Sequence, residues 1–353
     1  MLYDGAREDT LFADGRPPRE DMHEVLRWAR ERIGLNGSHP WRLLSARRKM
    51  GKTLFEIEES TDHGPRRLIG KLCKAERADV LDRALRSLWS AGFCPPARHT
   101  VTEAIAILPE RGFILQERAP GVDGRTLVLR GGDEALRASH DAAEWLAALH
   151  RAPVRACAGM HDPDTIGRWV RELSEAVPDE ARRLGRIEDA VLRELADLVT
   201  DTVPSHGDFH PMNIFIHTSG DVGQAPGLRG APGPADLQAS HRITGIDLDK
   251  FSQREPEFDV GYYLAQTAAF GYFATGAMDS TAEARRAFLD RYRETSGREV
   301  RARRAGMHAA ITFLKNLHYD LVLLKTERVE RAAPWLASAE AAILEDDLGM
   351  GAT

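Results

Sequence analysis

The feature that most constrains this chain is a short motif of acidic, amide and histidine side chains that begins at position 206. The motif reads His206-Gly-Asp-Phe-His-Pro-Met-Asn213, and it is followed by Ile246-Asp-Leu-Asp249 and by Asp259. Phosphoryl transfer needs an acid side chain that orients and deprotonates the accepting hydroxyl, and oxygen ligands for the magnesium ions that neutralise charge between the phosphates. Asp208 can supply the first, and Asn213 with Asp247 the second. The order of these residues therefore predicts a metal-dependent phosphoryl transfer site.

Asp208 and Asn213 have the spacing of the protein kinase catalytic loop, in which the Asp is followed by four residues and then by the metal-binding Asn. With His206-Gly in place of the usual His-Arg, the chain resembles the aminoglycoside phosphotransferase and choline kinase-like family over about residues 41–323. The resemblance implies an α+β, protein kinase-like bilobal fold, with a small antiparallel-sheet N-terminal lobe and a larger, mainly helical C-terminal lobe. It also implies ATP or GTP as donor, Mg²⁺ as cofactor, Asp208 as catalytic base and His206 as a residue that orients the loop.

The composition is compatible with two lobes. The 353 residues are 42% hydrophobic and 29% charged, which gives ample apolar material for a packed core. We expect a leading helical segment over residues 1–40, an N-terminal nucleotide-binding lobe over 41–118, and a C-terminal catalytic and substrate-binding lobe over 119–353. The formal net charge of -6 gives no electrostatic reason to expect a nucleic acid or an anionic membrane as partner.

The N-terminus and the cysteines indicate a cellular compartment. Charged residues stand where a signal peptide needs an apolar run, and no segment approaches the length of a transmembrane helix. The three cysteines have neither metal-type nor redox spacing, which suits a reducing environment. We expect a cytoplasmic protein that acts as a monomer or a homodimer.

The N-terminal lobe begins with two predicted strands, 41–45 and 53–58, joined by a turn that contains Gly51 and Lys52. In a kinase-like fold this hairpin covers the nucleotide phosphates, where backbone amides and a cation stabilise the anion. Lys52 is therefore a candidate nucleotide contact. An ordinary exposed hairpin explains the pattern equally well, because the full glycine-rich signature is missing.

Lys71 is the candidate phosphate-binding lysine. It lies in a third predicted strand, 67–74, where Ile69 and Lys71 project to the same face. The family implies that a carboxylate from the next helix, predicted over 78–91, holds this lysine. Asp79 and Asp82 are available, and Asp82 is preferred from its distance to the helix end. The alternatives are that Lys71 is a surface lysine on an edge strand, or that Lys74 takes its role.

Two more strands, 101–108 and 112–117, complete the predicted small lobe, and a Gly- and Pro-containing connector follows at 119–124. In this fold class the connector backbone reads the adenine edge. Backbone groups of Gln116 and Arg118 are therefore candidate nucleotide contacts, and a plain interlobe linker is the alternative.

The C-terminal lobe is predicted to begin with helices, which include 133–150, and to return after the catalytic loop to strands at 214–216 and 243–248. Between them, residues 218–242 are crowded with Gly and Pro, which predicts a flexible surface insert. It is either a hairpin tip with no role or a lid or partner contact near the substrate cleft.

Three carboxylates follow the insert. The carboxylate of Asp247 ends the apolar strand 243–248, where it is costly unless paired or metal-bound. Asp249 is a candidate second ligand or a supporting residue. Asp259 precedes an apolar helix, and the family gives it a structural role beneath the catalytic loop, whereas the residue pattern alone indicates a helix cap.

The acceptor is the open part of the prediction. From Asp279 onward the chain has 12 acidic and 12 basic residues, so no acidic excess is set aside for a polycation. A small-molecule hydroxyl, such as one on an aminoglycoside, a choline-like compound or another natural product, is the expected acceptor. The alternatives are a Ser or Thr of a peptide or protein, and a non-catalytic module that only binds nucleotides.

Overall fold

The computed structural model describes residues 41–49, 52–62, 64–159, 161–197, 201–218 and 241–344, together with Arg27 and Glu31, which are helical. The predicted leading segment 1–40, Gly51 and the insert 218–242 thus lie almost wholly outside the described residues. The chain divides into two compact units. The sheet unit comprises the described residues up to Val122 together with those of 215–251, and the helical unit comprises the described residues of 123–214 and those from Ser252 onward. Asp247 therefore belongs to the sheet unit, although the predicted boundary at residue 118 assigned it to the C-terminal lobe.

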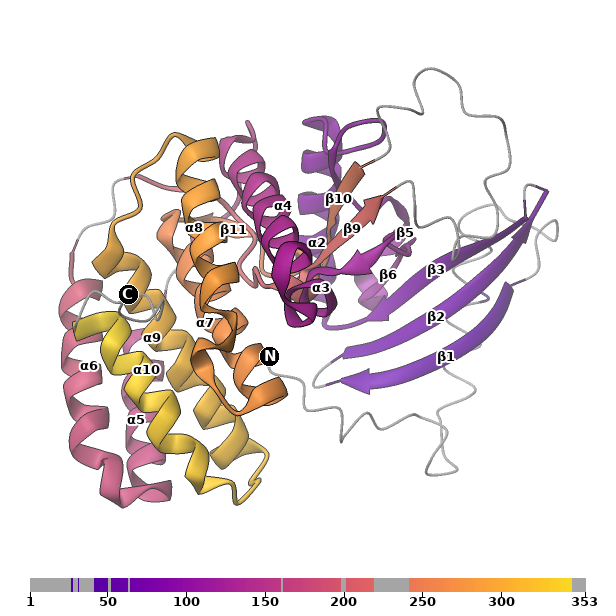
Figure 1. Cartoon of the computed structure of the whole chain (residues 1–353). Coiled ribbons are helices and arrows are strands. Elements are labelled where there is room, and N and C mark those ends of the chain that lie inside the picture. Colours follow the sequence, from indigo (N-terminus) through magenta and orange to yellow (C-terminus); the bar gives the residue numbers. More distant parts are fainter. Residues whose placement is uncertain are drawn as a thin grey trace. The chain divides into compact units, whose positions relative to one another are not determined.

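The main element of the sheet unit is a five-stranded antiparallel sheet with the strand order β1-β2-β3-β6-β5 (Figure 1). Its strands are β1 (Trp41–Lys49), β2 (Lys52–Thr61), β3 (Gly64–Leu72), β5 (Ala104–Leu108) and β6 (Phe113–Glu117). Along β2 every second side chain from Phe55 to Glu59 is buried, as expected for a strand with one covered face. Buried Glu59 is satisfied by Trp41, whose indole Nε1 donates to it over 3.0 Å.

A second, four-stranded sheet of order β4-β10-β9-β7 corrects two sequence predictions. Its strands are β4 (His99–Val101), β7 (Val122–Asp123), β9 (Ile214–Thr218) and β10 (His241–Gly245). The single strand predicted at 101–108 is wrong, because β4 pairs in parallel with β10 whereas β5 pairs with β6. The strand predicted at 243–248 ends at Gly245, so Asp247 lies beyond it. Helix α2 (Ala75–Ser90) packs against β4, β5 and β6.

The helical unit is built around α7 (Glu257–Thr275), which is buried all along Glu257–Gly271. A helix that is covered on every side is a core helix. In Figure 1, α7 lies against α9 (Ala302–His318), α9 against α10 (Ala332–Leu344), and α4 (Gly132–Arg151) against α8 (Ala282–Ser296). The remaining elements of this unit are α3 (Gly124–Arg130), α5 (Pro163–Ala176), α6 (Ala181–Leu195), and the paired strands β8 (Val203–Ser205) and β11 (Ser252–Arg254).

This architecture confirms the predicted α+β class, with an antiparallel sheet in the N-terminal part and helices in the C-terminal part. The helix predicted over 133–150 is α4. Across the described ranges, every helix is too short or too polar to cross a bilayer.

Helices α9 and α10 approach closely at Gly306. A Cβ at this position would lie 1.9 Å from the carbonyl oxygen of Ala342. Gly306→Ala should therefore lower the free energy of unfolding, measured in urea, by about 1–3 kcal/mol, because the two backbones must separate. Gly185→Ala in α6 is the matched control, since a Cβ there has no neighbour within 4 Å. It should stabilise by about 0.5–1 kcal/mol. Equal effects of the two substitutions would contradict the close helix packing.

Candidate active site

The predicted catalytic loop between β8 and β9 is closed on itself. Gly207 has a φ of 80°, a left-handed conformation that favours glycine, and a single 3-10 turn follows at Pro211–Asn213. The Asn213 side-chain amide donates to the carbonyl oxygen of Asp208 over 3.0 Å. The Asp208 amide donates to Nδ1 of His206 over 3.3 Å, and the His206 ring packs edge-on against Trp145. The predicted base and the predicted metal ligand are therefore fixed in one compact turn.

Asp259 anchors this loop from below. Its carboxylate accepts hydrogen bonds from the amides of His206, at 2.8 Å, and Gly207, at 3.0 Å, and it is fully buried. His150 Nε2 lies 3.2 Å from the same carboxylate, and its Nδ1 lies 2.7 Å from the Tyr292 hydroxyl. Burial alone would raise the pKa of Asp259, but the bond to His150 and the charges of His150 and His206 lower it. Asp259 lies inside the first turn of α7, whose N-cap is Pro256, so it does not cap the helix.

Two residues that the sequence analysis missed support the Asp208 carboxylate, Tyr262 by direct contact and Lys315 through Tyr262. The Tyr262 hydroxyl donates to Asp208 Oδ1, and Lys315 Nζ donates to the Tyr262 oxygen over 3.1 Å. Burial, and then the neighbouring Asp208 charge, raise the pKa of Tyr262 well above its usual value, so the phenol stays a proton donor. A signal was present in the sequence, because Tyr262 is three residues after Asp259 and shares its helix face. Lys315 gave no such signal.

In the sheet unit, Lys71 is held by two carboxylates. Its Nζ donates to Asp247 and, over 2.9 Å, to Asp249, and its side chain is only 2% exposed. Lys52 Nζ lies 2.8 Å from the other oxygen of Asp247. Burial would lower the pKa of Lys71, but the charges of Asp247 and Asp249 raise it. Burial would likewise raise the pKa of Asp247, but Lys71 and Lys52 hold it well below its usual range. The structure therefore brings Lys52, Lys71, Asp247 and Asp249 together.

The predicted ion pair between Lys71 and Asp82 is wrong. Asp82 instead accepts from Arg86, one turn further along α2, over 2.5 Å. The alternative carboxylate, Asp79, pairs in the same way with Arg83 over 2.8 Å. Arginines four residues after each aspartate compete for these carboxylates. Lys71 is instead compensated by Asp247 and Asp249, from the segment after β10.

Gln116 and Arg118, the two residues predicted to contact the adenine, already form hydrogen bonds within the sheet unit. Gln116 lies in β6 between Ile69 of β3 and Ala104 of β5, and its side-chain oxygen accepts from Thr102 over 3.0 Å. The Arg118 amide already donates to the carbonyl oxygen of Arg67 over 3.0 Å. A nucleotide contact through this amide would therefore require the loss of a sheet hydrogen bond.

The donor groups suit a hard divalent cation. Asp249 Oδ1 is buried and has no hydrogen-bond partner among the described residues, and the Asp247 carboxylate attracts two ammonium groups. In the helical unit, Asn213 uses its amide nitrogen within the loop, which leaves the amide oxygen as its acceptor atom. No group of three His, Cys, Asp or Glu residues with metal-site geometry occurs in the described part of the chain. Mg²⁺ commonly binds through one or two carboxylates plus substrate phosphates, so the Asp247 and Asp249 carboxylates of the sheet unit fit it.

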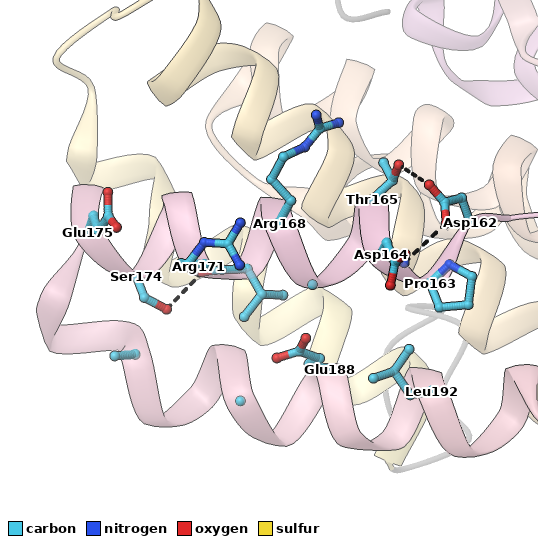
Figure 2. A pocket seen from close by; sticks show the side chains of 14 residues that line it. Asp162, Pro163, Asp164, Thr165, Arg168, Arg171, Ser174, Glu175, Glu188 and Leu192 are labelled. Carbon is cyan, nitrogen blue, oxygen red and sulfur yellow. Dashed lines mark hydrogen bonds between the residues drawn. The ribbon is translucent and has the colours of Figure 1, made fainter.

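A surface groove of about 1070 Å³ lies between α5 and α6 (Figure 2). Its walls carry charges of both signs, among them Arg168, Arg171 and Glu188. At one end the Asp162 carboxylate caps α5 by accepting from the Asp164 amide, at 3.2 Å, and from the Thr165 hydroxyl, at 2.6 Å. None of the predicted site residues lines this groove, so we do not assign the reaction to it.

The Asp259 anchor predicts a pH-dependent loss of stability. Asp259→Asn should lower the free energy of unfolding at neutral pH by about 3 kcal/mol, because two amides lose a charged acceptor. The folded pKa of Asp259 is depressed, so its contribution is complete above the unfolded pKa of about 3.9 and is lost as the pH falls through the lower folded value.

Urea unfolding of both proteins from pH 7 to pH 3 measures this difference. Asp162→Asn is the matched control, because asparagine caps a helix about as well as aspartate. A difference between wild type and Asp259→Asn that grows as the pH falls would contradict the assigned role.

Comparison with known proteins gives the same family as the motif. Residues 60–227 match the model of the phosphotransferase enzyme family. No curated protein matches the sequence.

Solved structures with the same fold cover almost the whole chain. Choline kinase LicA from Streptococcus pneumoniae is 16% identical with a TM-score of 0.55, and the alignment covers 90% of this chain and 99% of that one. A choline/ethanolamine kinase family protein from Mesorhizobium loti is 15% identical with a TM-score of 0.54, covering 93% and 97%. A thermostable mutant of aminoglycoside phosphotransferase APH(4)-Ia, in ternary complex with ADP and hygromycin B, is 16% identical with a TM-score of 0.55, covering 92% and 99%. The resemblance expected from the sequence is confirmed, because the chain matches the phosphotransferase enzyme family over residues 60–227 and has the fold of choline kinase-like proteins and aminoglycoside phosphotransferases.

Proposed function

We propose that this chain is a kinase that transfers the γ-phosphoryl group of ATP, or GTP, to a hydroxyl of a small molecule. The observation that carries the proposal is the placement of Asp208. Its carboxylate stands in a loop of the expected spacing, which is pinned by Asp259, closed by Asn213 and oriented by Tyr262. A base that must meet a hydroxyl in one geometry benefits from such support.

In this proposal Lys71 and Lys52 contact the nucleotide phosphates, and Asn213 and Asp247 are the ligands of Mg²⁺. The bound ion would neutralise charge between the β- and γ-phosphates. The cluster of Lys52, Lys71, Asp247 and Asp249 in the sheet unit supports the assignment. Its two ammonium groups already pair with the Asp247 carboxylate, and phosphate oxygens carry the same kind of charge. Asp249 compensates Lys71, which keeps a buried cation charged without a nucleotide.

The chemical step uses Asp208 as a base. The acceptor oxygen forms a bond to the γ-phosphorus while the bond to the bridging oxygen breaks and ADP leaves, and Asp208 accepts the hydroxyl proton late in the transfer. Tyr262 acts as a positioning residue, because its hydroxyl holds Oδ1 of the carboxylate in place. The phosphorylated acceptor and ADP are the products.

A small-molecule acceptor is favoured over the two alternatives. The structurally similar proteins named above include a choline kinase and an aminoglycoside phosphotransferase bound to hygromycin B, which are not protein kinases. The intact set of Asp208, Asn213 and Asp247 argues against a non-catalytic module.

Replacement of the base tests the reaction directly. Asp208→Asn should reduce turnover by about 10²–10⁴-fold, measured as ADP release in the presence of an acceptor, because the amide cannot accept the proton. The amide oxygen can still accept from Tyr262, so we expect the fold and the affinity for ATP to persist. A variant with normal turnover would show that Asp208 is not the base.

Replacement of Asp247 tests the metal assignment. Asp247→Ala should weaken the Mg²⁺-dependent part of ATP binding at least about tenfold, measured by calorimetry with and without Mg²⁺, because one anionic ligand is lost. Asp82→Ala removes a carboxylate that pairs only with Arg86 among the interactions described above, and it should leave the Mg²⁺ dependence unchanged. Equal behaviour of the two variants would overturn the ligand assignment.

A further inference from the structure

We propose that Lys52 is a built-in counter-ion of Asp247, which keeps a divalent cation off this carboxylate until nucleotide phosphates draw the ammonium group away. The cation then binds tightly only together with the nucleotide. This inference rests on the proposed function. It concerns the sheet unit alone, because every residue of the cluster of Lys52, Lys71, Asp247 and Asp249 belongs to that unit.

The first argument is the way in which the two lysines share Asp247. Lys71 Nζ donates to Oδ1 of this carboxylate. Lys52 Nζ lies 2.8 Å from Oδ2 and 3.2 Å from Oδ1, so it bridges the two oxygens. The lysines thus divide the carboxylate, with Lys52 on Oδ2. A divalent cation that binds Oδ2 must come close to this ammonium group, and the two positive charges repel each other.

The second argument is that Lys52 is the more exchangeable of the two lysines. Lys71 lies inside the sheet, opposite Leu54 of β2 and Ile114 of β6, and its side chain is 2% exposed. It also donates to Asp249 over 2.9 Å. Lys52 is the first residue of β2, and its side chain is 13% exposed. A flexible lysine at a strand end can exchange one anionic partner for another, whereas a buried lysine with two carboxylates is fixed.

The third argument is the charge of the cluster. Its two ammonium groups and two carboxylates balance each other. Burial raises the pKa of the thiol of Cys73, so the thiol adds no negative charge, and Arg77 is among the cations that act on it. A divalent cation alone would therefore give the site an excess of positive charge. The phosphates of a nucleotide supply the negative charge that is needed, and they offer Lys52 a new partner.

One further oxygen of the cluster fits the cation that Lys52 holds off. Asp249 Oδ1 is buried and has no hydrogen-bond partner among the described residues, while Oδ2 of the same carboxylate accepts from Lys71. A buried carboxylate oxygen without a donor is costly. A cation would satisfy it together with the Asp247 carboxylate once Lys52 has moved, and two carboxylates plus phosphates are a common ligand set for Mg²⁺.

Cation binding without nucleotide tests this inference on the full chain. Mn²⁺, a paramagnetic substitute for Mg²⁺, is titrated into the protein, and bound Mn²⁺ is measured by EPR. Lys52→Met and Lys52→Gln should both bind Mn²⁺ at least about tenfold more tightly than the wild type, because no ammonium group competes for Asp247. Lys52→Arg keeps the charge and should bind Mn²⁺ as weakly as the wild type. Arg83→Met is the matched control and should also behave as the wild type, because it removes a cation that pairs with Asp79, at 2.8 Å, within α2.

The same titration with ADP tests whether phosphates draw Lys52 away. With the protein in excess over ADP, the wild type and Lys52→Met should bind Mn²⁺ with similar affinity, because Lys52 of the wild type has then left Asp247. ADP should therefore strengthen Mn²⁺ binding about tenfold more in the wild type than in Lys52→Met. Adenosine, which has no phosphates, should leave the difference between the two proteins as large as it is without ligand.

The outcomes separate this inference from the proposed function. Equal affinities of the wild type and Lys52→Met for Mn²⁺ without nucleotide, with both proteins folded as judged by Tm, would overturn the inference. So would a difference that ADP leaves unchanged, or a gain that persists in the double variant Lys52→Met/Asp247→Ala, because the cation would then bind elsewhere. These results leave the phosphoryl transfer itself untouched, whereas Asp208→Asn with wild-type turnover would contradict the proposed function.

Discussion

The catalytic-type loop of the helical unit depends on one interaction, the hydrogen bonds that the buried carboxylate of Asp259 accepts from the loop backbone. It accepts hydrogen bonds from two consecutive loop amides, those of His206 and Gly207, immediately before Asp208, the proposed base. A buried charge is stable only when it is paired and hydrogen-bonded, and His150 completes the set. Because α7 is covered on all sides, the anchor is rigid. The same helix presents Tyr262 one turn later, so a single element holds both the loop backbone before Asp208 and the Asp208 side chain.

The sheet unit contains a buried cation, Lys71, which needs negative partners in the same way that the buried Asp259 needs donors. Lys71 is nearly inaccessible, and Asp247 and Asp249 compensate it together with Lys52. Asp247 has a φ of 63°, in the left-handed region that is uncommon for a residue with a side chain. Such conformations persist where surrounding contacts over-determine them, and they gather at functional sites. The ion pairs of Asp247 are contacts of this kind, and they fit a residue whose carboxylate must be presented in one direction.

The sequence was most informative for features that are encoded by a motif with fixed spacing or by a regular hydrophobic period. The loop from His206 to Asn213, the helical C-terminal part and the antiparallel N-terminal sheet follow from motif spacing and hydrophobic periodicity. Periodicity could not show that the run 101–108 divides between two sheets, because β4 takes its partner β10 from a segment about 140 residues away. It also could not show that Lys315 contacts Tyr262. Both contacts are set by tertiary packing between distant elements, which local pattern does not encode. The pairing of Arg86 with Asp82, by contrast, joins residues four apart on one helix and was open to prediction from helical spacing.

The central claim is that the phosphoryl group moves from the nucleotide to an alcohol. Phosphorus-31 NMR of the chain with Mg²⁺, ATP and a pool of hydroxylated small molecules that are anionic, neutral and cationic tests it most directly. The account predicts that the γ-phosphate signal is replaced by a phosphate monoester signal in step with the appearance of ADP. An unchanged ATP spectrum, or inorganic phosphate as the only new product, would contradict it.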